Sequence, residues 1–159
     1  MFRAACGGLL AVLTAADMAV KQYIEDTYGK GEEYETVLPK VRLRKVYNTG
    51  FAFNLFDRYP KLIRQCSAVS ALGVLAGSAS AFLKKGRRGL KLGMTFVMAG
   101  AASNLYDRLA RGKVIDYIGV ESENSYLSKL TANLADFYIV IGMAMVTVSQ
   151  MIHRKKDRS

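Results

Sequence analysis

Four long apolar stretches, separated by charged connectors, constrain this chain more than any other feature of its sequence. They cover about residues 2–20, 65–83, 90–105 and 134–152, and their interiors hold few charges. The hydrocarbon core of a bilayer is roughly 30 Å thick, so about 20 residues of helix cross it at 1.5 Å per residue. The 159 residues are therefore expected to form one all-α membrane domain with four transmembrane helices.

Other interpretations fit these stretches less well. The first has the parts of a cleaved signal peptide, with Arg3 before a short apolar run, but three further spans favour an uncleaved anchor. The second and third could be buried helices of a soluble bundle, which would need polar residues at helical spacing. Residues 66–83 instead carry serine, glycine and alanine, which suit close helix packing in lipid.

Basic residues gather in the connectors. The net charge is +10, and dense basic patches lie at Arg3, at residues 84–88 and at residues 154–158. With four alternating spans these patches share one side of the membrane, and their density in short flanks favours the cytoplasmic side, although the opposite side has more basic residues in total. We therefore expect both termini to be cytoplasmic. Attraction to anionic lipid explains the charge more simply than nucleic-acid binding.

The first outer connector predicts a small β region over about residues 37–57. Residues 41–44 alternate apolar and basic side chains, which is a strand pattern. Asn48-Thr49-Gly50 supplies turn chemistry, and the aromatic-rich residues 51–56 read as a second strand. We expect this hairpin or small sheet to lie at the outer membrane surface. A plain hairpin with no chemistry is the alternative.

A second group of polar residues marks the outer ends of the third and fourth stretches. Asn104 and Arg108 are four residues apart and share a helical face, and Asp116 follows eight residues later. Asp136, a carboxylate in the apolar start of the fourth stretch, is costly in lipid and is a functional candidate by default. It could equally belong to a helix start that Asn133 caps, and one helix start can have both roles.

These residue types limit the chemistry on offer. A cysteine nucleophile needs a histidine partner, and the one histidine lies in the charged tail. A dyad of Ser103 with Lys21 is a looser alternative. A metal site of Asp107, Asp116 and Asp136 would suit Mg²⁺ or Ca²⁺ better than hydrolytic Zn²⁺. Two aspartates at one membrane depth offer aspartic-type peptide hydrolysis, because one keeps a proton while the other activates water.

Four short motifs occur in order along the chain. Asp17 pairs with Lys21 near the end of the first stretch, and the sequence N-T-G-F-A-F begins at Asn48. N-L-Y-D-R begins at Asn104 and continues through G-K-V-I-D, and N-L-A-D ends at Asp136. Together these motifs resemble those of lipoprotein signal peptidase, or signal peptidase II. The chain departs from the family pattern at Ser103, Tyr117 and the polar segment 121–132.

The resemblance implies a membrane peptidase on the outer side of the bacterial inner membrane. Its substrates would be prolipoproteins that carry a diacylglyceryl group on a cysteine, cleaved just before that cysteine without metal or organic cofactor. We also expect a monomer that contacts membrane lipid and binds no nucleic acid. The implied residues are a catalytic dyad of Asp116 and Asp136, a substrate-binding or bracing set of Asn48, Gly50, Asn104, Arg108 and Asn133, and a structural set of Asp17, Lys21 and Asp107.

A non-enzymatic protein is the alternative hypothesis, either a four-span scaffold or a small transport subunit. On that hypothesis Asp136 is only a helix cap and Asp116 is a surface loop residue. Cysteines placed at positions 116 and 136 would then fail to cross-link. The proximity of these two positions in the folded protein therefore separates the two hypotheses.

Overall fold

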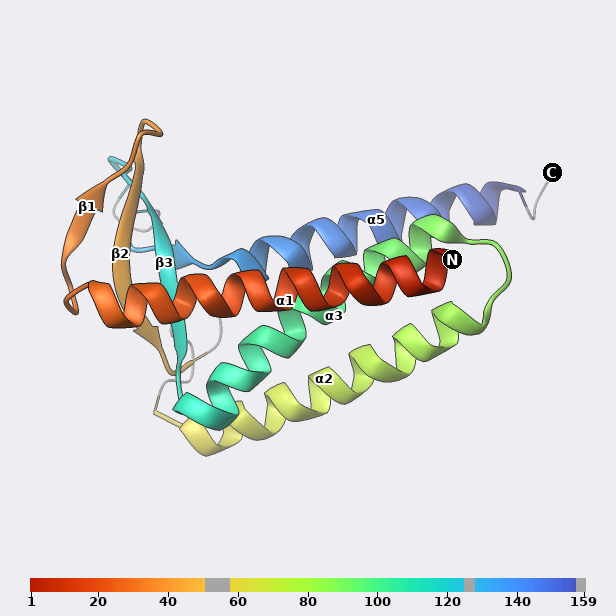
Figure 1. The fold of residues 1–159 in the computed structure, drawn as a ribbon, viewed down its shortest axis with the longest axis horizontal. Coiled ribbons are helices and arrows are strands. Elements are labelled where there is room, and N and C mark those ends of the chain that lie inside the picture. Colours follow the sequence, from red (N-terminus) through yellow and green to blue (C-terminus); the bar gives the residue numbers. More distant parts are fainter. Residues whose placement is uncertain (51–57, 125–127, 157–159) are drawn as a thin grey trace.

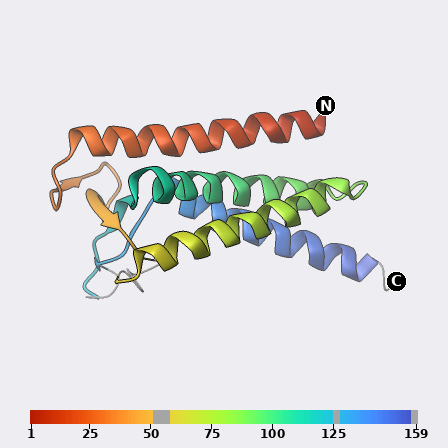
Figure 2. The same ribbon diagram turned by 90° about the horizontal axis from the view of Figure 1, so that it is seen from below.

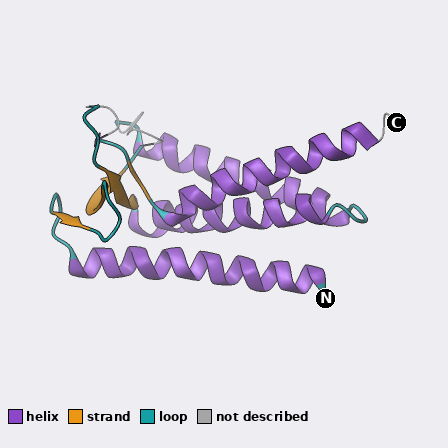
Figure 3. Ribbon diagram, turned by 90° about the horizontal axis from the view of Figure 1, so that it is seen from above, coloured by secondary structure: helices purple, strands orange, loops and turns teal. Residues whose placement is uncertain are grey.

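The computed structural model describes residues 1–50, 58–124 and 128–156. In this part of the chain, long helices run side by side and a small sheet lies at one end of them (Figures 1 and 3). The elements are α1 (Phe2–Thr27), β1 (Glu33–Glu35), β2 (Val41–Asn48), α2 (Pro60–Leu83), α3 (Arg88–Tyr106), a π-helical turn η2 (Asp107–Arg111), β3 (Val114–Val120), β4 (Thr131–Ala132) and α5 (Leu134–Lys156).

The helices coincide with the four predicted stretches, but only three are candidate membrane spans by length and composition. These three are Phe2–Thr27, Lys61–Leu83 and Leu134–Arg154. The predicted third span forms α3, which is less apolar because it carries polar residues along its length. Thr95, Ser103 and Asn104 are all buried there, so protein rather than lipid surrounds them.

Helix α3 has the central position. It packs against α1, α2 and α5, whereas α1 and α2 make few direct contacts with each other. Figure 2 shows α1 as a separate rod beside the group formed by the other helices. A central helix can bury polar side chains against its neighbours, which explains how α3 accommodates them.

Glycines bring α3 and α5 into close contact. A Cβ atom added at Gly93 would lie 2.8 Å from the carbonyl oxygen of Gly142, and one added at Gly142 would lie 2.6 Å from that of Gly93. At Gly100 an added Cβ would collide with the carbonyl oxygen of Ala135. Small residues that let two backbones approach are the usual basis of helix packing in membranes.

The sheet corrects the predicted β region. It has four strands in the order β1-β2-β3-β4, and every neighbouring pair is antiparallel. Strand β2 extends to Asn48, the first residue of the predicted turn, and its partners are β1 and β3. The predicted second strand, residues 51–56, lies outside the described residues. Neither β3 nor β4 was predicted.

Packing at the end of α1 fixes the sheet against the helices. Ile24 of α1 is buried against Ile115 and Tyr117 of β3, and Leu43 and Leu134 pack around them. The start of α1, the end of α5 and the turn between α2 and α3 lie at the opposite end of the molecule (Figure 1). Arg3, residues 84–88 and Arg154, which belong to the three basic patches predicted to share one side of the membrane, are therefore at one end, and the sheet is at the other.

Candidate active site

Asp116 lies in the middle of β3, with only 3% of its surface exposed. One carboxylate oxygen accepts a hydrogen bond from the Asn48 side-chain amide at 3.0 Å, and the other accepts one from the Asn133 amide at 2.6 Å. Asn48 reaches it because β2 pairs with β3 so that Val46 faces Asp116. Asp116 is therefore a buried strand residue, not the surface loop residue of the scaffold hypothesis.

Asp136 lies in the first turn of α5 and is half-buried. Its carboxylate accepts the Asn133 backbone N–H at 3.1 Å, while the Asn133 side-chain oxygen accepts the Asp136 N–H at 3.0 Å. This reciprocal pair is a capping box that satisfies two N–H groups at the helix start. A further hydrogen bond comes from the Asn104 amide at 2.9 Å. The predicted helix cap is thus present, and the same carboxylate also faces α3.

Asn133 joins the two carboxylates. Its side-chain amide donates to Asp116 and its backbone N–H donates to Asp136. Asn133 itself is fully buried, so this bridge lies inside the protein. One residue that bonds two acids from different elements holds both at the same depth, where the sheet meets α5.

Burial raises the pKa of Asp116 to about 6 from its ordinary value of 3.8, and the charge of Asp136 adds to this shift. The hydrogen bonds from Asn48 and Asn133 act in the opposite direction, because they stabilise the carboxylate. Asp116 therefore binds a proton more tightly than an exposed aspartate does.

A buried ion-pair cluster lies next to the carboxylates and connects α1 with α3 and η2. Lys21 is fully buried, and its ammonium group lies 2.8 Å from Asp17 and 3.1 Å from Asp107. It also donates to the side-chain oxygen of Asn104 at 2.8 Å. Because the Asn104 amide in turn donates to Asp136, a chain of hydrogen bonds runs from Lys21 to that carboxylate.

Asp17 extends this cluster to the start of α5. Its carboxylate accepts hydrogen bonds from the Tyr117 hydroxyl at 3.2 Å and from the Ala135 N–H at 3.1 Å. The Tyr117 oxygen in turn accepts the Leu134 N–H at 3.1 Å. Tyr117 was noted in the sequence only as a departure from the family motif. Its role here is to fix β3 and α5 to α1 on the face opposite Asp116.

Arg108 lies on η2, the π-helical turn that follows α3. Its guanidinium group donates to the carbonyl oxygen of Gly50 at 3.1 Å, and its Nε atom is buried without a partner in the described part of the chain. Burial lowers the pKa of Arg108, and the negative charges of Asp116 and Asp136 oppose this effect. Such π-turns are frequent at functional sites because they redirect side chains. Here Asn104 contacts Asp136, while Arg108 donates to Gly50 and is influenced by the charges of both carboxylates.

A family model described as signal peptidase (SPase) II matches residues 9–152. The chain belongs to the signal peptidase II family.

Relatives named lipoprotein signal peptidase cover most of the chain. One from Sinorhizobium fredii is 31% identical over 152 residues, which are 94% of this chain and 88% of that protein. One from Mesorhizobium japonicum is 30% identical over 152 residues, or 94% of this chain and 89% of that protein. One from Pseudomonas aeruginosa is 34% identical over 115 residues, or 71% and 68% of the two chains.

Solved structures share the fold. A bacterial membrane enzyme determined by the in meso method at 2.3 Å has a TM-score of 0.81 and 19% identity, covering 98% of this chain and 90% of that one. A second, at 1.9 Å, has a TM-score of 0.75 and 18% identity, covering 92% of each chain. As a member of the signal peptidase II family, the chain is a protease and a bacterial membrane protein.

The contacts of Ser103 and Lys21 test the alternative that these two residues form a catalytic dyad. Lys21 does contact Ser103, at 3.3 Å, although 82 residues separate them. Both side chains are fully buried, and the Ser103 hydroxyl donates to Asp17 at 2.5 Å. Lys21 donates to the Ser103 oxygen while Ser103 donates to Asp17, so this pair braces α1 against α3. Asp107 is likewise engaged by Lys21 and by Arg111, at 3.2 Å.

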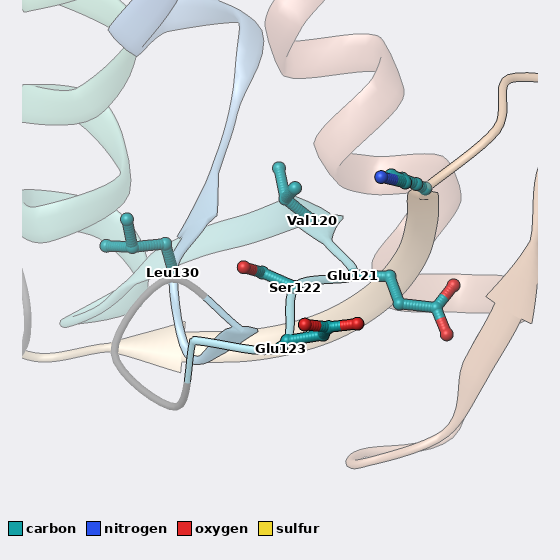
Figure 4. A pocket seen from close by; sticks show the side chains of 6 residues that line it. Val120, Glu121, Ser122, Glu123 and Leu130 are labelled. Carbon is teal, nitrogen blue, oxygen red and sulfur yellow. The ribbon is translucent and has the colours of Figure 1, made fainter.

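A hollow of about 650 Å³ lies beyond the far end of β3, away from these motifs (Figure 4). No signal peptidase II motif residue lines it within the described residues, and three of its side chains are charged. The candidate active site is thus defined by the carboxylates and their amide partners. The hollow is lined by Lys40, Val120, Glu121, Ser122, Glu123 and Leu130.

Proposed function

We propose that the chain is a membrane aspartic endopeptidase that removes the signal peptide from diacylglyceryl-modified prolipoproteins. Cleavage occurs just before the lipidated cysteine, and Asp116 and Asp136 form the catalytic dyad. The observation that carries this proposal is the pair of hydrogen bonds by which Asn133 holds both carboxylates. Membership of the signal peptidase II family supplies the substrate class.

The dyad performs both halves of peptide hydrolysis. The ionised carboxylate takes a proton from water, and the water oxygen forms a bond to the scissile carbonyl carbon. The protonated carboxyl donates a hydrogen bond to the carbonyl oxygen, where negative charge develops. When the C–N bond breaks, a carboxyl proton passes to the leaving nitrogen. Acid and base come from the protein, so the reaction needs neither metal nor organic cofactor.

Asparagine amides set the direction of each carboxylate. Asn48 and Asn133 donate to the two oxygens of Asp116, and Asn104 donates to Asp136. Fixed donors leave each carboxylate fewer orientations, which lowers the entropy cost of reaching the reactive geometry. Arg108 holds the Gly50 carbonyl and thereby braces the end of β2 where the substrate peptide would lie.

The proposal includes an arrangement in the membrane. Helix α3 is the fourth span, and its polar residues are shielded by α1, α2 and α5. The termini and the basic turn between α2 and α3 are cytoplasmic, while the sheet and the carboxylates lie on the outer side. A monomer suffices, because every residue assigned a role comes from one chain.

Cleavage of a diacylglyceryl-modified prolipoprotein tests the proposal. Purified wild type should cleave it, whereas Asp116→Asn and Asp136→Asn should each lose activity by roughly 10²–10⁴-fold while still inserting in the membrane. Asp26→Asn, at an exposed site on α1, is the matched control and should retain activity. The unmodified precursor should not be cleaved. Activity retained in either dyad variant would overturn the assignment.

A further inference from the structure

We propose that a groove between α1, α2 and α3, at the end of the molecule that carries the termini, binds one glycerophospholipid. The phosphate lies at Arg3 and an acyl chain extends along the apolar lining. This site is separate from the candidate active site, and the proposal stands independently of the dyad.

The groove exists because α1 and α2 pack on α3 with few contacts to each other. It has a volume of about 340 Å³, and its lining includes Arg3, Gly7, Leu10, Ser78 and Met98. A second hollow of about 490 Å³ shares Leu10 and Met98 with it and continues toward the sheet with an almost wholly apolar lining. The two hollows adjoin at these shared residues, both linings are mainly apolar, and Arg3 is the charged residue that lines the one at the terminal end.

Ser78 supplies an independent indication of a ligand. Its hydroxyl is buried, with 3% of the residue exposed, and it has no hydrogen-bond partner within the described residues. A helical serine usually bonds the carbonyl group four residues earlier, and an unpartnered hydroxyl in apolar surroundings is costly. Ser78 precedes the end of α2 at Leu83 by five residues, or about 8 Å at the helical rise. The ester carbonyl of a glycerophospholipid lies at a comparable depth below its phosphate and would accept this hydrogen bond.

The mouth of the groove favours a phosphate. Arg3 lies in the first turn of α1, and neither α1 nor α3 has a side-chain cap or an acidic residue in its first turn. Both helices begin at this end (Figure 1), so the positive ends of two helix dipoles point there. Arg88, at the start of α3, lies over the Phe2 ring at 5.7 Å, so a second guanidinium group lies near the start of α1.

The order of these groups identifies the class of ligand. A cationic mouth, one buried hydroxyl and then an apolar channel match the phosphate, ester and acyl chain of a glycerophospholipid in the leaflet at that end. A wholly apolar transmembrane helix from a partner protein would leave the Ser78 hydroxyl unpaired. A diacylglycerol would leave the cationic mouth unfilled.

Native mass spectrometry of the full-length protein in detergent, titrated with phosphatidylglycerol, measures this binding. Gly7→Leu is the decisive variant, because Gly7 lines the groove and nothing lies within 4 Å of an added Cβ. Leucine also favours the helix over glycine, so the variant should fold. Gly8→Leu is the matched control, since nothing lies within 4 Å of its Cβ and Gly8 does not line the groove. We expect at least tenfold weaker binding for Gly7→Leu and unchanged binding for Gly8→Leu.

Two further variants test the polar contacts. Arg3→Gln should weaken phosphatidylglycerol binding roughly tenfold, whereas Arg154→Gln, an exposed arginine on α5, should not. Ser78→Ala should weaken it by a few fold relative to Ser80→Ala, which is exposed on the same helix. Diacylglycerol, which lacks the phosphate, should bind at least tenfold more weakly than phosphatidylglycerol.

Three outcomes would overturn the proposal. Equal binding by Gly7→Leu and Gly8→Leu would mean that the lipid lies elsewhere. Equal loss in Arg3→Gln and Arg154→Gln would mean diffuse charge attraction, and equal affinity for diacylglycerol would exclude a phosphate site. If circular dichroism showed that Gly7→Leu does not fold, the arginine and serine pairs would decide the question.

Discussion

The buried charge of Asp116 makes a quantitative prediction about stability. Its pKa is raised from 3.8 to about 6, and each pKa unit corresponds to about 1.4 kcal/mol. The folded protein therefore binds this proton more tightly than the unfolded chain, so the stabilisation is complete below about pH 3.8 and is lost as the pH rises to about 6. At pH 7 the ionised Asp116 costs about 3 kcal/mol, and at pH 4.5 about 1 kcal/mol.

Asp116→Asn removes this pH-dependent cost. The new amide adds a cost of its own, because its NH₂ group faces a donor from Asn48 or Asn133, and one lost hydrogen bond is worth about 1–3 kcal/mol. That second cost does not vary with pH. The stability of the variant relative to wild type should thus improve by about 2 kcal/mol between pH 4.5 and pH 7, whatever the constant offset.

Thermal unfolding in detergent, followed by circular dichroism, measures this difference. For a chain of this size, 2 kcal/mol corresponds to roughly 4–8 °C in Tm. Asp26→Asn, at an exposed position, should show no such trend and serves as control. A difference that is constant with pH, or that shrinks as the pH rises, would refute the argument that the ionised Asp116 is buried at a cost.

Three other substitutions test the framework around the site. Lys21→Met should lower the free energy of unfolding by about 3–5 kcal/mol, because it leaves two buried carboxylates without their cation. Thermal unfolding measures this loss, and a value below about 1 kcal/mol would contradict the prediction. Gly93→Leu should destabilise by about 1–3 kcal/mol or more in the same assay through collision with α5, while Gly73→Leu, where an added Cβ meets nothing, should be neutral. Asn133→Ala removes the cap of α5 and a donor to the dyad, so we expect a loss of about 1–2 kcal/mol and at least tenfold lower kcat; unchanged kcat would exclude its positioning role.

The helices were predictable because lipid imposes a simple rule on them. Long apolar runs identified all four helices. The observed helix ends differ from the predicted ones where the helix leaves the hydrocarbon core. Helix α2 begins at Pro60 rather than at residue 65, because the helix continues into the interface, where Lys61 and Arg64 reach water. Helix α3 was predicted as a span on its apolar run, yet it is not among the described helices that are long and apolar enough to cross a membrane, and it carries buried polar side chains.

The sheet was harder to predict for physical reasons. Residues 114–117 of β3 are all buried, so the strand shows no alternation of apolar and polar residues. Strand β4 is only two residues long and has no sequence signature. Only part of the ion-pair cluster could be predicted from the sequence, namely the pair of Asp17 and Lys21, which are four residues apart. Their third partner, Asp107, is far along the chain, and only the fold brings it to them.

The glycine contact between α3 and α5 determines which parts of the molecule can move. Gly93 and Gly142 leave no room for a methyl group, so neither helix can slide or rotate past the other without a backbone collision. Asn104 and Asp136 are carried by this close-packed pair and are joined by a hydrogen bond of 2.9 Å. If the proposed function holds, a lipid-linked peptide that enters beside the carboxylates gains its space by displacing α1, α2 or the sheet. Entry and release then involve the periphery of the molecule, while the α3–α5 pair remains fixed.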